Sequence, residues 1–395
     1  MTNRCQGVRD DSMTADTSYA EKTLVPLVDL KAQFLALQPR IQARLCETLS
    51  ACRFILGPEV EELENELARF SGARHAICVA SGTDALKISL MTEGLGPGDA
   101  VLVPSFTFVA TAEAVASLGA TPVFVDIDKE TFNLDPDDLL RRLDNLKGDR
   151  RLQPRAIIAV DLFGLPADYP AINEIAEHYG LLVVADAAQS FGGSVSGQRV
   201  GSLAPVTATS FYPSKPLGCY GDGGCMLTDD DERAAIMRSI HRHGVDSDSR
   251  TAIYVGMNSR LDTLQAAVLL AKLDVFEEEL KARNHIAQCY GSKLCNIAGV
   301  PKWPAQFTSA WALYSILVRD RDRVRDALAH EGIATGIYYS VPLHLQPAYA
   351  GYGDGWGSLP VSEGVSEQIL SLPMHPYLDE ETIDRICRAT VRALT

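Results

Sequence analysis

Apolar residues in the middle of the chain form short continuous runs instead of alternating with polar residues. Each run has the length of a strand, and patterns with apolar residues three or four positions apart, which predict helices, lie between the runs. Continuously apolar strands are typical of a parallel sheet that helices cover on both faces. The predicted strands are Ala76–Ala80, Ala100–Pro104, Pro122–Ile127, Ala156–Phe163 and Leu181–Ala185, and the helices between them include Asp84–Met91, Ala110–Leu118 and Tyr169–Tyr179.

Longer helical patterns flank this alternation. Asp29 can cap a helix over about Lys31–Ser50, and Pro58 suits the first turn of a second helix that ends at Gly72. Two more helices are predicted over about Asp230–His241 and Asp262–Ala282.

Beyond Gly299 the pattern changes to short, scattered apolar runs. It predicts a helix near Asp322–His330, a loop region rich in Pro and Gly over Val341–Pro360, and a last helix from Asp379. A change of this kind favours a second, smaller α+β domain at the C-terminus.

The predicted organisation has three parts. Residues 1–24 are polar and aperiodic, which predicts a mobile tail. We expect a large α/β domain over residues 25–284 and a small domain over residues 285–395, which the N-terminal helix joins.

Composition restricts the partners. The chain has 395 residues, of which 46% are hydrophobic, enough for two packed domains. Its formal net charge of −15 repels nucleic acid and anionic lipid, so we expect neither as a partner. The most apolar region, Ala100–Val125, contains Pro104, Glu113 and Gly119, so it does not predict a transmembrane span.

The cysteines indicate a reducing compartment. Their number, nine, is odd, and none forms a Cys-x-x-Cys pair. No basic-then-apolar signal pattern stands at the N-terminus, so we predict buried, reduced thiols in a cytoplasmic protein. The pair His241 and His243 has no carboxylate at metal-ligand spacing, and no metal site is predicted.

One lysine lies in an unusually constrained turn. Lys215 stands between two strand-like runs, Val206–Phe211 and Gly224–Leu227, with Pro213 and Pro216 stiffening the backbone beside it. Desolvation in such a loop lowers the pKa of an amine and exposes it as a nucleophile, as a Schiff base requires. The alternative is an ordinary lysine in a surface turn.

Polar residues also follow two predicted strands. Gly82 and Thr83 lead directly into a helix, whose free N–H groups, close backbone approach and hydroxyl favour an anion site; an ordinary helix cap is the alternative. No Walker or Gly-x-Gly-x-x-Gly pattern is present. Asp186 ends a very apolar strand, where it can pair with a protonated ring nitrogen or cap a turn, and Gln189 is near enough to donate to a neighbouring ring oxygen.

Four features now occur together: the anion site, Asp186, an aromatic loop with Phe106 and Phe108, and Lys215. Each alone is weak. In this order on a parallel sheet, where ligands bind at the carboxyl ends of the strands, they indicate pyridoxal 5′-phosphate (PLP).

At this point the chain resembles the DegT/StrS family of sugar-nucleotide aminotransferases, which are fold-type I PLP enzymes. The resemblance covers about residues 25–390. It depends on seven motifs: Phe54-Ile-Leu-Gly-Pro-Glu59, Ser81-Gly-Thr-Asp-Ala-Leu86, Pro104-Ser-Phe-Thr-Phe-Val-Ala-Thr111, Asp186-Ala-Ala-Gln-Ser190, Ser210-Phe-Tyr-Pro-Ser-Lys215, Gly221-Asp-Gly-Gly224 and Asn258-Ser-Arg-Leu-Asp262.

The resemblance implies a role for each matching position. Lys215 would bind PLP covalently and shuttle protons, and a His there would instead mark the family's sugar dehydratases. Asp186 would hold the pyridinium, Gln189 the phenolic oxygen, and Phe108 would stack on the ring. The phosphate would be bound by Gly82, Thr83 and Ser210 of one subunit and by Asn258 of its neighbour, which implies a homodimer with shared active sites.

Within the family, three segments resemble the aminotransferases that act on UDP-2-acetamido-2-deoxy-3-oxo-glucuronate in pathways to surface polysaccharides such as lipopolysaccharide O-antigen. This implies a ping-pong reaction in which glutamate is the amino donor and pyridoxamine phosphate (PMP) is the intermediate form. Those enzymes carry Gly and Tyr where this chain has Cys52 and Phe54. The segments are Lys215–Gly224, Asn258–Ala267 and Leu370–Tyr377.

A hexuronate needs a cation for its carboxylate. Arg260 is the candidate because a guanidinium can bind a carboxylate through two hydrogen bonds; pairing with Asp262 or another surface acid is the alternative. The other substrate contacts that the resemblance implies are Phe54, Ser214, Tyr338, Tyr339 and His344.

Two other functions are open. One is the same chemistry on a dTDP-3- or 4-keto-6-deoxyhexose, which a neutral pocket around Arg260 would favour. The other is a non-catalytic regulator with the PLP fold, which the loss of Lys215 or Asp186 would favour, yet both are present.

Overall fold

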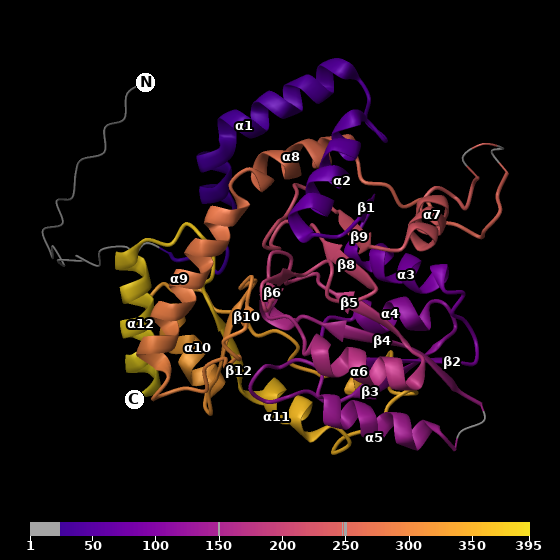
Figure 1. Cartoon of the computed structure of the whole chain (residues 1–395). Helices are drawn as coiled ribbons and strands as arrows, with labels where there is room; N and C mark the ends of the chain where they lie inside the picture. The colour runs from indigo at the N-terminus through magenta and orange to yellow at the C-terminus, as the bar shows by residue number, and fades with distance from the viewer. Residues whose placement is uncertain (1–23, 149–150, 247, 249–250) are drawn as a thin grey trace, which may run out of the picture.

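The computed structural model describes residues 24–395 except 149–150, 247 and 249–250. Apart from Leu24, the predicted tail lies outside these residues. A seven-stranded sheet, in the order β1-β9-β8-β5-β4-β2-β3, occupies the middle of the large part of the chain, and all its strands are parallel except β9 (Figure 1). The strands are β1 (His75–Val79), β2 (Asp99–Pro104), β3 (Thr121–Val125), β4 (Gln153–Val160), β5 (Leu182–Asp186), β8 (Val206–Ser210) and β9 (Gly224–Thr228).

Helices cover the sheet, and shorter strands lie outside it. The helices are α1 (Leu30–Ala51), α2 (Pro58–Ser71), α3 (Gly82–Thr92), α4 (Ala110–Ala116), α5 (Pro136–Leu146), α6 (Tyr169–Tyr179), α7 (Asp231–Ile240), α8 (Thr263–Leu273), α9 (Phe276–Leu294), α10 (Arg321–His330), α11 (Pro360–Gln368) and α12 (Glu380–Leu394). The shorter strands are β6 (Ser194–Val195), β7 (Gln198–Arg199), β10 (Phe307–Thr308), β11 (Tyr314–Leu317) and β12 (Ile369–Leu372).

The continuous apolar runs arise because both faces of the sheet are buried. In β1, Ile77 and Val79 pack in the cluster that includes α3, α4 and α7, while Ala76 and Cys78 pack in the cluster of α2 and α8. Successive side chains of a strand point to opposite faces, so each face needs its own apolar set. The prediction of a mostly parallel sheet covered by helices is confirmed.

The predicted helix Asp262–Ala282 is wrong in one respect. The structure has two helices here, α8 and α9, and the chain turns between them at Val275 (φ −117°, ψ 3°). The turn buries Phe276 against Phe191, with ring centroids 6.0 Å apart. Neither Gly nor Pro signals this break, although the three glutamates at the start of α9 are typical of a helix N-terminus.

The N-terminal helix α1 packs against α8, and the expectation that it joins the small domain is corrected. Leu37 and Ile41 of α1 share a buried cluster with Val268 and Ala271 of α8. In Figure 1, α1 lies over α8 and apart from α10 and α12. The segment before the helix reaches the C-terminal part, where Val25 pairs with Ile333, and the first turn of α1 borders a small cavity with His375 and Tyr377.

The C-terminal part has its own core, which the second half of α9 shares with β11, β12, α10 and α12. The segment before β12 does not belong to this core: its residues Leu343, Leu359 and Val365 pack in the core of the large sheet. The proposed boundary near residue 284 falls inside α9 and stays a prediction. Within the described part of the chain, no helix combines the length and the apolar character needed to cross a bilayer.

Candidate active site

A cavity of about 500 Å³ opens at the carboxyl ends of β1, β4, β5 and β8. Because these strands are parallel, their ends meet at one edge of the sheet, and residues far apart in sequence come together there. The predicted site residues that line this cleft are Gly82, Thr83, Phe108, Asp186, Gln189, Ser210, Ser214, Lys215, Tyr338 and Tyr339.

Lys215 is held in a tightly closed turn after β8. Its backbone N–H donates to the carbonyl of Tyr212 over 2.8 Å, and the N–H of Cys219 donates to the carbonyl of Phe211 over 2.8 Å. A Cβ on Gly218 would lie 2.5 Å from the carbonyl oxygen of Pro213, so only glycine lets the turn close. Burial lowers the pKa of the Lys215 amine, which favours the neutral, nucleophilic form.

Asp186 ends β5 and is 6% exposed. Its Oδ2 accepts a hydrogen bond from the hydroxyl of Thr111 over 2.9 Å, and its Oδ1 accepts one from the N–H of Ala188 over 3.3 Å. Burial raises the pKa of Asp186; the two hydrogen bonds and the charge of Lys215 oppose this shift. A cationic ring nitrogen in the cleft would offset the cost of burying this carboxylate, so the site fits a pyridinium.

The start of α3 forms an anion cradle. The hydroxyl of Ser81 accepts from the N–H of Asp84 over 3.1 Å, while the N–H groups of Gly82 and Thr83 lie in the first turn, where a helix offers no acceptor. A Cβ on Gly82 would lie 2.7 Å from the Cβ of Ser210. Glycine therefore brings the helix N-terminus next to the Ser210 hydroxyl, an arrangement that fits a phosphate.

Tyr339 forms part of one wall of the cleft, and two further aromatic rings pack against it. Tyr339 stacks on Phe163, with centroids 6.0 Å apart, and meets the edge of the buried Phe106 at 5.5 Å. Gln189 joins this wall, since its Nε2 donates to the Tyr339 hydroxyl over 2.8 Å and its Oε1 accepts from the N–H of Phe163 over 2.7 Å. Tyr339 has a φ of +57°, a strained conformation that the surrounding contacts maintain. Phe108 lines the cleft with 57% of its surface exposed.

Four predicted site residues, Phe54, Asn258, Arg260 and His344, do not line this cleft. Phe54 is 43% exposed and Asn258 is also exposed. Arg260 donates from Nη2 to Oδ1 of Asn258 over 2.6 Å. Among the described residues it forms no ion pair with Asp262, the alternative that its sequence position suggested.

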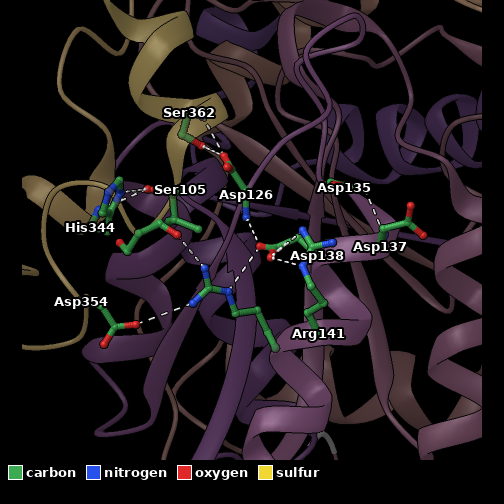
Figure 2. A network of polar contacts seen from close by, with 12 residues as sticks. Ser105, Asp126, Asp135, Asp137, Asp138, Arg141, His344, Asp354 and Ser362 are labelled. Atoms are coloured by element: carbon green, nitrogen blue, oxygen red, sulfur yellow. Dashed lines mark hydrogen bonds and ion pairs between the residues drawn. The ribbon is translucent and has the colours of Figure 1, made fainter.

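The expectation that His344 contacts substrate is corrected. Its ring is 1% exposed, with Nδ1 2.6 Å from the hydroxyl of Ser105 and Nε2 3.0 Å from Oε1 of Glu363, so neither nitrogen is left for a ligand. Figure 2 shows it pointing to Ser105, beside a second contact in which Ser362 donates to Asp126 over 2.6 Å. These bonds fasten the start of α11 to the ends of β2 and β3.

Sequence analysis did not single out two residues that lie close to the floor of the cleft, Thr111 and Asp161. Thr111 orients Asp186, and its only sequence signal was membership of the Pro104–Thr111 motif. Asp161 is fully buried at the end of β4 and accepts from the Tyr169 hydroxyl over 2.7 Å and the Ser190 hydroxyl over 2.5 Å. The predicted strand Ala156–Phe163 concealed it, because the apolar run continues past the true strand end at Val160.

Comparison with known proteins decides the family. The model of the "DegT/DnrJ/EryC1/StrS aminotransferase family" matches residues 36–391. The chain belongs to this family.

Two relatives are similar over nearly their whole length. The UDP-2-acetamido-2-deoxy-3-oxo-D-glucuronate aminotransferase of Pseudomonas aeruginosa is 48% identical, over 93% of this chain and 99% of its own. The dTDP-3-amino-3,4,6-trideoxy-alpha-D-glucose transaminase of Streptomyces venezuelae is 39% identical, over 94% of this chain and 97% of its own.

Solved structures of aminotransferases are also similar to this chain. A DegT DnrJ EryC1 StrS aminotransferase from Brucella abortus is 49% identical, covers 93% of this chain and 99% of its own, and superposes with a TM-score of 0.92. NtdA from Bacillus subtilis, solved with bound cofactor PMP, is 29% identical, covers 95% and 86%, and has a TM-score of 0.86.

The protein is therefore a PLP-dependent sugar aminotransferase of fold-type I. The predictions of family, fold class and cofactor are confirmed. The acid at the end of β5, the anion cradle and the half-buried Lys215 are the three features of this chain that fit the cofactor.

Proposed function

We propose that the protein transfers the amino group of glutamate to the 3-keto carbon of UDP-2-acetamido-2-deoxy-3-oxo-D-glucuronate. The observation that carries this proposal is the 48% identity with the Pseudomonas aeruginosa enzyme over 93% of the chain. The product would serve the synthesis of a surface polysaccharide such as lipopolysaccharide O-antigen, and we place the reaction in the cytoplasm, as the cysteine pattern suggests.

Different residues of the chain would bind the phosphate and the ring of the cofactor. The first turn of α3, through Gly82 and Thr83, and the hydroxyl of Ser210 would hold its phosphate. Asp186 would pair with the ring nitrogen, and Thr111 would keep its carboxylate in place. When bound, PLP supplies an electron sink at the carbon that gains or loses the amino group.

Lys215 would do two things. Burial lowers the pKa of its amine, against the charge of Asp186, and the unprotonated amine would bind the cofactor covalently between turnovers. During each half-reaction the released amine would take a proton from one atom and deliver it to another, which sets the configuration of the new amino group. The aromatic wall of Phe106, Phe163 and Tyr339 would exclude water from that side.

We also propose a homodimer with shared active sites. Phe54, Asn258 and Arg260 do not reach the cleft of their own chain, yet they are neighbours on one surface: the N–H of Thr263 donates to the carbonyl of Phe54 over 2.9 Å, and Ile55 pairs with Asp262. A single surface could therefore present all three to the cleft of a second subunit. Asn258 would then reach the phosphate there.

Arg260 would bind the substrate carboxylate. Its Nη2 contacts the amide of Asn258, and its buried Nε has no hydrogen-bond partner among the described residues. A guanidinium without a neighbouring acid keeps its charge available for a carboxylate ligand. Ser214 and Tyr338, which line the cleft, would contact the sugar.

A neutral sugar is the second candidate. Cys52 and Phe54 stand where the glucuronate enzymes carry Gly and Tyr, and the Streptomyces venezuelae relative is named for a dTDP-amino sugar. A dTDP-3- or 4-keto-6-deoxyhexose would then be the substrate, and Arg260 would have no carboxylate to bind.

The proposed substrate can be tested by comparing a panel of keto-sugar nucleotides. The protein, loaded with PLP, is incubated with glutamate and with keto-sugar nucleotides that differ in the carboxylate and in the position of the keto group, and mass spectrometry identifies the aminated products. Amination of the 3-oxo-glucuronate in preference to its neutral counterparts supports the proposal. Preference for a neutral 6-deoxy sugar would overturn it, while the absorbance change with glutamate alone reports the first half-reaction independently.

A further inference from the structure

Lys215 borders a second, much smaller cavity of about 10 Å³. Its other walls are the segment just before α1, the first turn of α1, helix α9 and the loop after β12. The polar side chains that line it besides Lys215 are Asp29, Gln33, Arg283, His375 and Tyr377. A space of this size holds one water molecule when two or more polar groups face it.

Two of these side chains are buried with polar atoms unsatisfied. His375 is 4% exposed, and among the described residues neither of its ring nitrogens has a hydrogen-bond partner. Arg283 is also 4% exposed; its Nη1 donates to the carbonyls of Trp311 (2.9 Å) and Met374 (3.3 Å), whereas its Nε has no partner within the described chain. Buried polar nitrogens normally form a hydrogen bond with another protein group or with an ordered water molecule.

The other walls are already fixed by protein contacts. Oδ1 of Asp29 accepts from the N–H of Ala32 over 2.8 Å. Gln33 and Tyr377 both donate to Glu279, over 3.0 Å and 2.7 Å to Oε1. The unmet hydrogen-bonding capacity at the cavity is therefore concentrated on His375 and Arg283, next to Lys215.

We propose that this cavity binds one water molecule that joins His375 and Arg283 to Lys215, which makes His375 a positioning residue for the catalytic amine. The water would accept from Nε of Arg283 and donate one hydrogen to the unprotonated ring nitrogen of His375. Its second hydrogen is left for the Lys215 nitrogen whenever that amine is free and unprotonated. This inference rests on the proposed role of Lys215.

The charges around the ring agree with this arrangement. Burial lowers the pKa of His375 to about 4; the carboxylate of Asp29 opposes the shift and the charge of Arg283 adds to it. Lys215 and Tyr377 also border the cavity. At neutral pH the ring is therefore uncharged, with one nitrogen able to accept a hydrogen bond from water.

The first test is a crystal structure of the enzyme loaded with PMP, in which the Lys215 amine is free, at a resolution that shows ordered water. We expect one water within hydrogen-bonding distance of His375, of Nε of Arg283 and of Nζ of Lys215. The same density should persist in His375→Gln, whose amide keeps a polar partner, and should be lost in His375→Leu. A wild-type structure in which protein groups bond both ring nitrogens and no water is present would overturn the proposal.

The second test needs no sugar substrate. The absorbance of PLP bound to Lys215 is titrated with pH in the same three proteins. We expect the midpoint to move by about one pH unit, a tenfold change in equilibrium, in His375→Leu, and to return towards the wild-type value in His375→Gln. Identical midpoints in all three proteins would refute the role of His375. Failure of the keto-sugar panel alone would leave both results unchanged, so the two proposals can be judged separately.

Discussion

The floor and the rim of the cleft are built in different ways. At the floor, Asp186 and Lys215 lie next to strand ends, are wholly or partly buried, and have their backbones or side chains tied by hydrogen bonds. At the rim, Phe54, Asn258 and Arg260 lie outside the cleft of their own chain. Asp186 and Lys215, the groups proposed for the amino-transfer chemistry, are thus brought together within one chain, whereas the rim residues would need a second chain to reach a cleft.

The largest effect is expected at the floor. Lys215→Ala removes the amine that moves protons, so we expect the glutamate half-reaction to slow by at least about 10²–10⁴-fold while PLP still binds non-covalently. Stopped-flow absorbance with glutamate measures the half-reaction, and dialysis measures retention of the cofactor. Lys281→Ala, at an exposed lysine on α9, is the control; turnover of Lys215→Ala near the wild-type rate would refute the assignment.

A mixture of two impaired chains tests whether the rim acts across subunits. Asn258→Ala should weaken PLP binding by about tenfold, since a hydrogen bond to a charged group is lost. When differently tagged Lys215→Ala and Asn258→Ala chains are co-purified as a mixed dimer, one of the two sites combines an intact Lys215 with an intact Asn258. At a PLP concentration that leaves the Asn258→Ala chain mostly unloaded, we expect activity to return in the mixed dimer only. If the Asn258→Ala chain alone is fully active, or mixing restores nothing, the shared site is disproved.

The same contrast separates what the sequence could predict from what it could not. Lys215 and Asp186 were found because each breaks a local rule: a charged group at the end of an apolar strand and a lysine between prolines both carry a cost that a function can explain. Asp161 breaks the same rule but was hidden, because Leu162 and Phe163 extend the apolar run beyond β4.

Other features depend on partners far away in the sequence. His344 was expected to contact substrate, but it is bonded to Ser105, 239 residues distant, and to Glu363. Likewise, the helix over about Lys31–Ser50 was predicted correctly, but the small domain was expected as its partner, whereas it packs on α8. Periodicity defines which face of an element is buried, while the identity of the covering element depends on the tertiary arrangement.

A smaller effect at the rim should appear as a change of selectivity. Arg260→Gln is expected to lower kcat/KM for the uronate substrate by about 10–100-fold, as expected when a charged hydrogen-bonding group is lost, and to change turnover of a neutral keto-sugar nucleotide much less. Arg260→Lys keeps the charge but loses the geometry for two hydrogen bonds, so its kcat/KM for the uronate substrate should lie between those of the wild type and of Arg260→Gln. Equal losses on both substrates would show that Arg260 acts on structure and not on the carboxylate.

The smallest expected effect is on the pH dependence of the free energy of unfolding, and it follows from the buried Asp161 at the floor of the cleft. Burial, with the nearby charge of Asp186 adding to it, raises the pKa of Asp161 from its ordinary 3.8 to about 7, against the hydrogen bonds from Ser190 and Tyr169. Between those two pH values the folded protein keeps a proton that the unfolded chain releases, so the free energy of unfolding falls as pH rises through this window.

Asp161→Asn should remove this dependence, because an amide can accept from Tyr169 through Oδ1 and donate to the hydroxyl of Ser190 through Nδ2. We expect urea unfolding of the wild type to lose about 1–3 kcal/mol more than the variant between pH 5 and pH 8. Asp168→Asn, at the exposed cap of α6, is the matched control and should follow the wild type. If Asp161→Asn also follows the wild type across that range, the carboxyl is already charged in the folded protein, and the floor of the cleft carries one more buried negative charge than proposed.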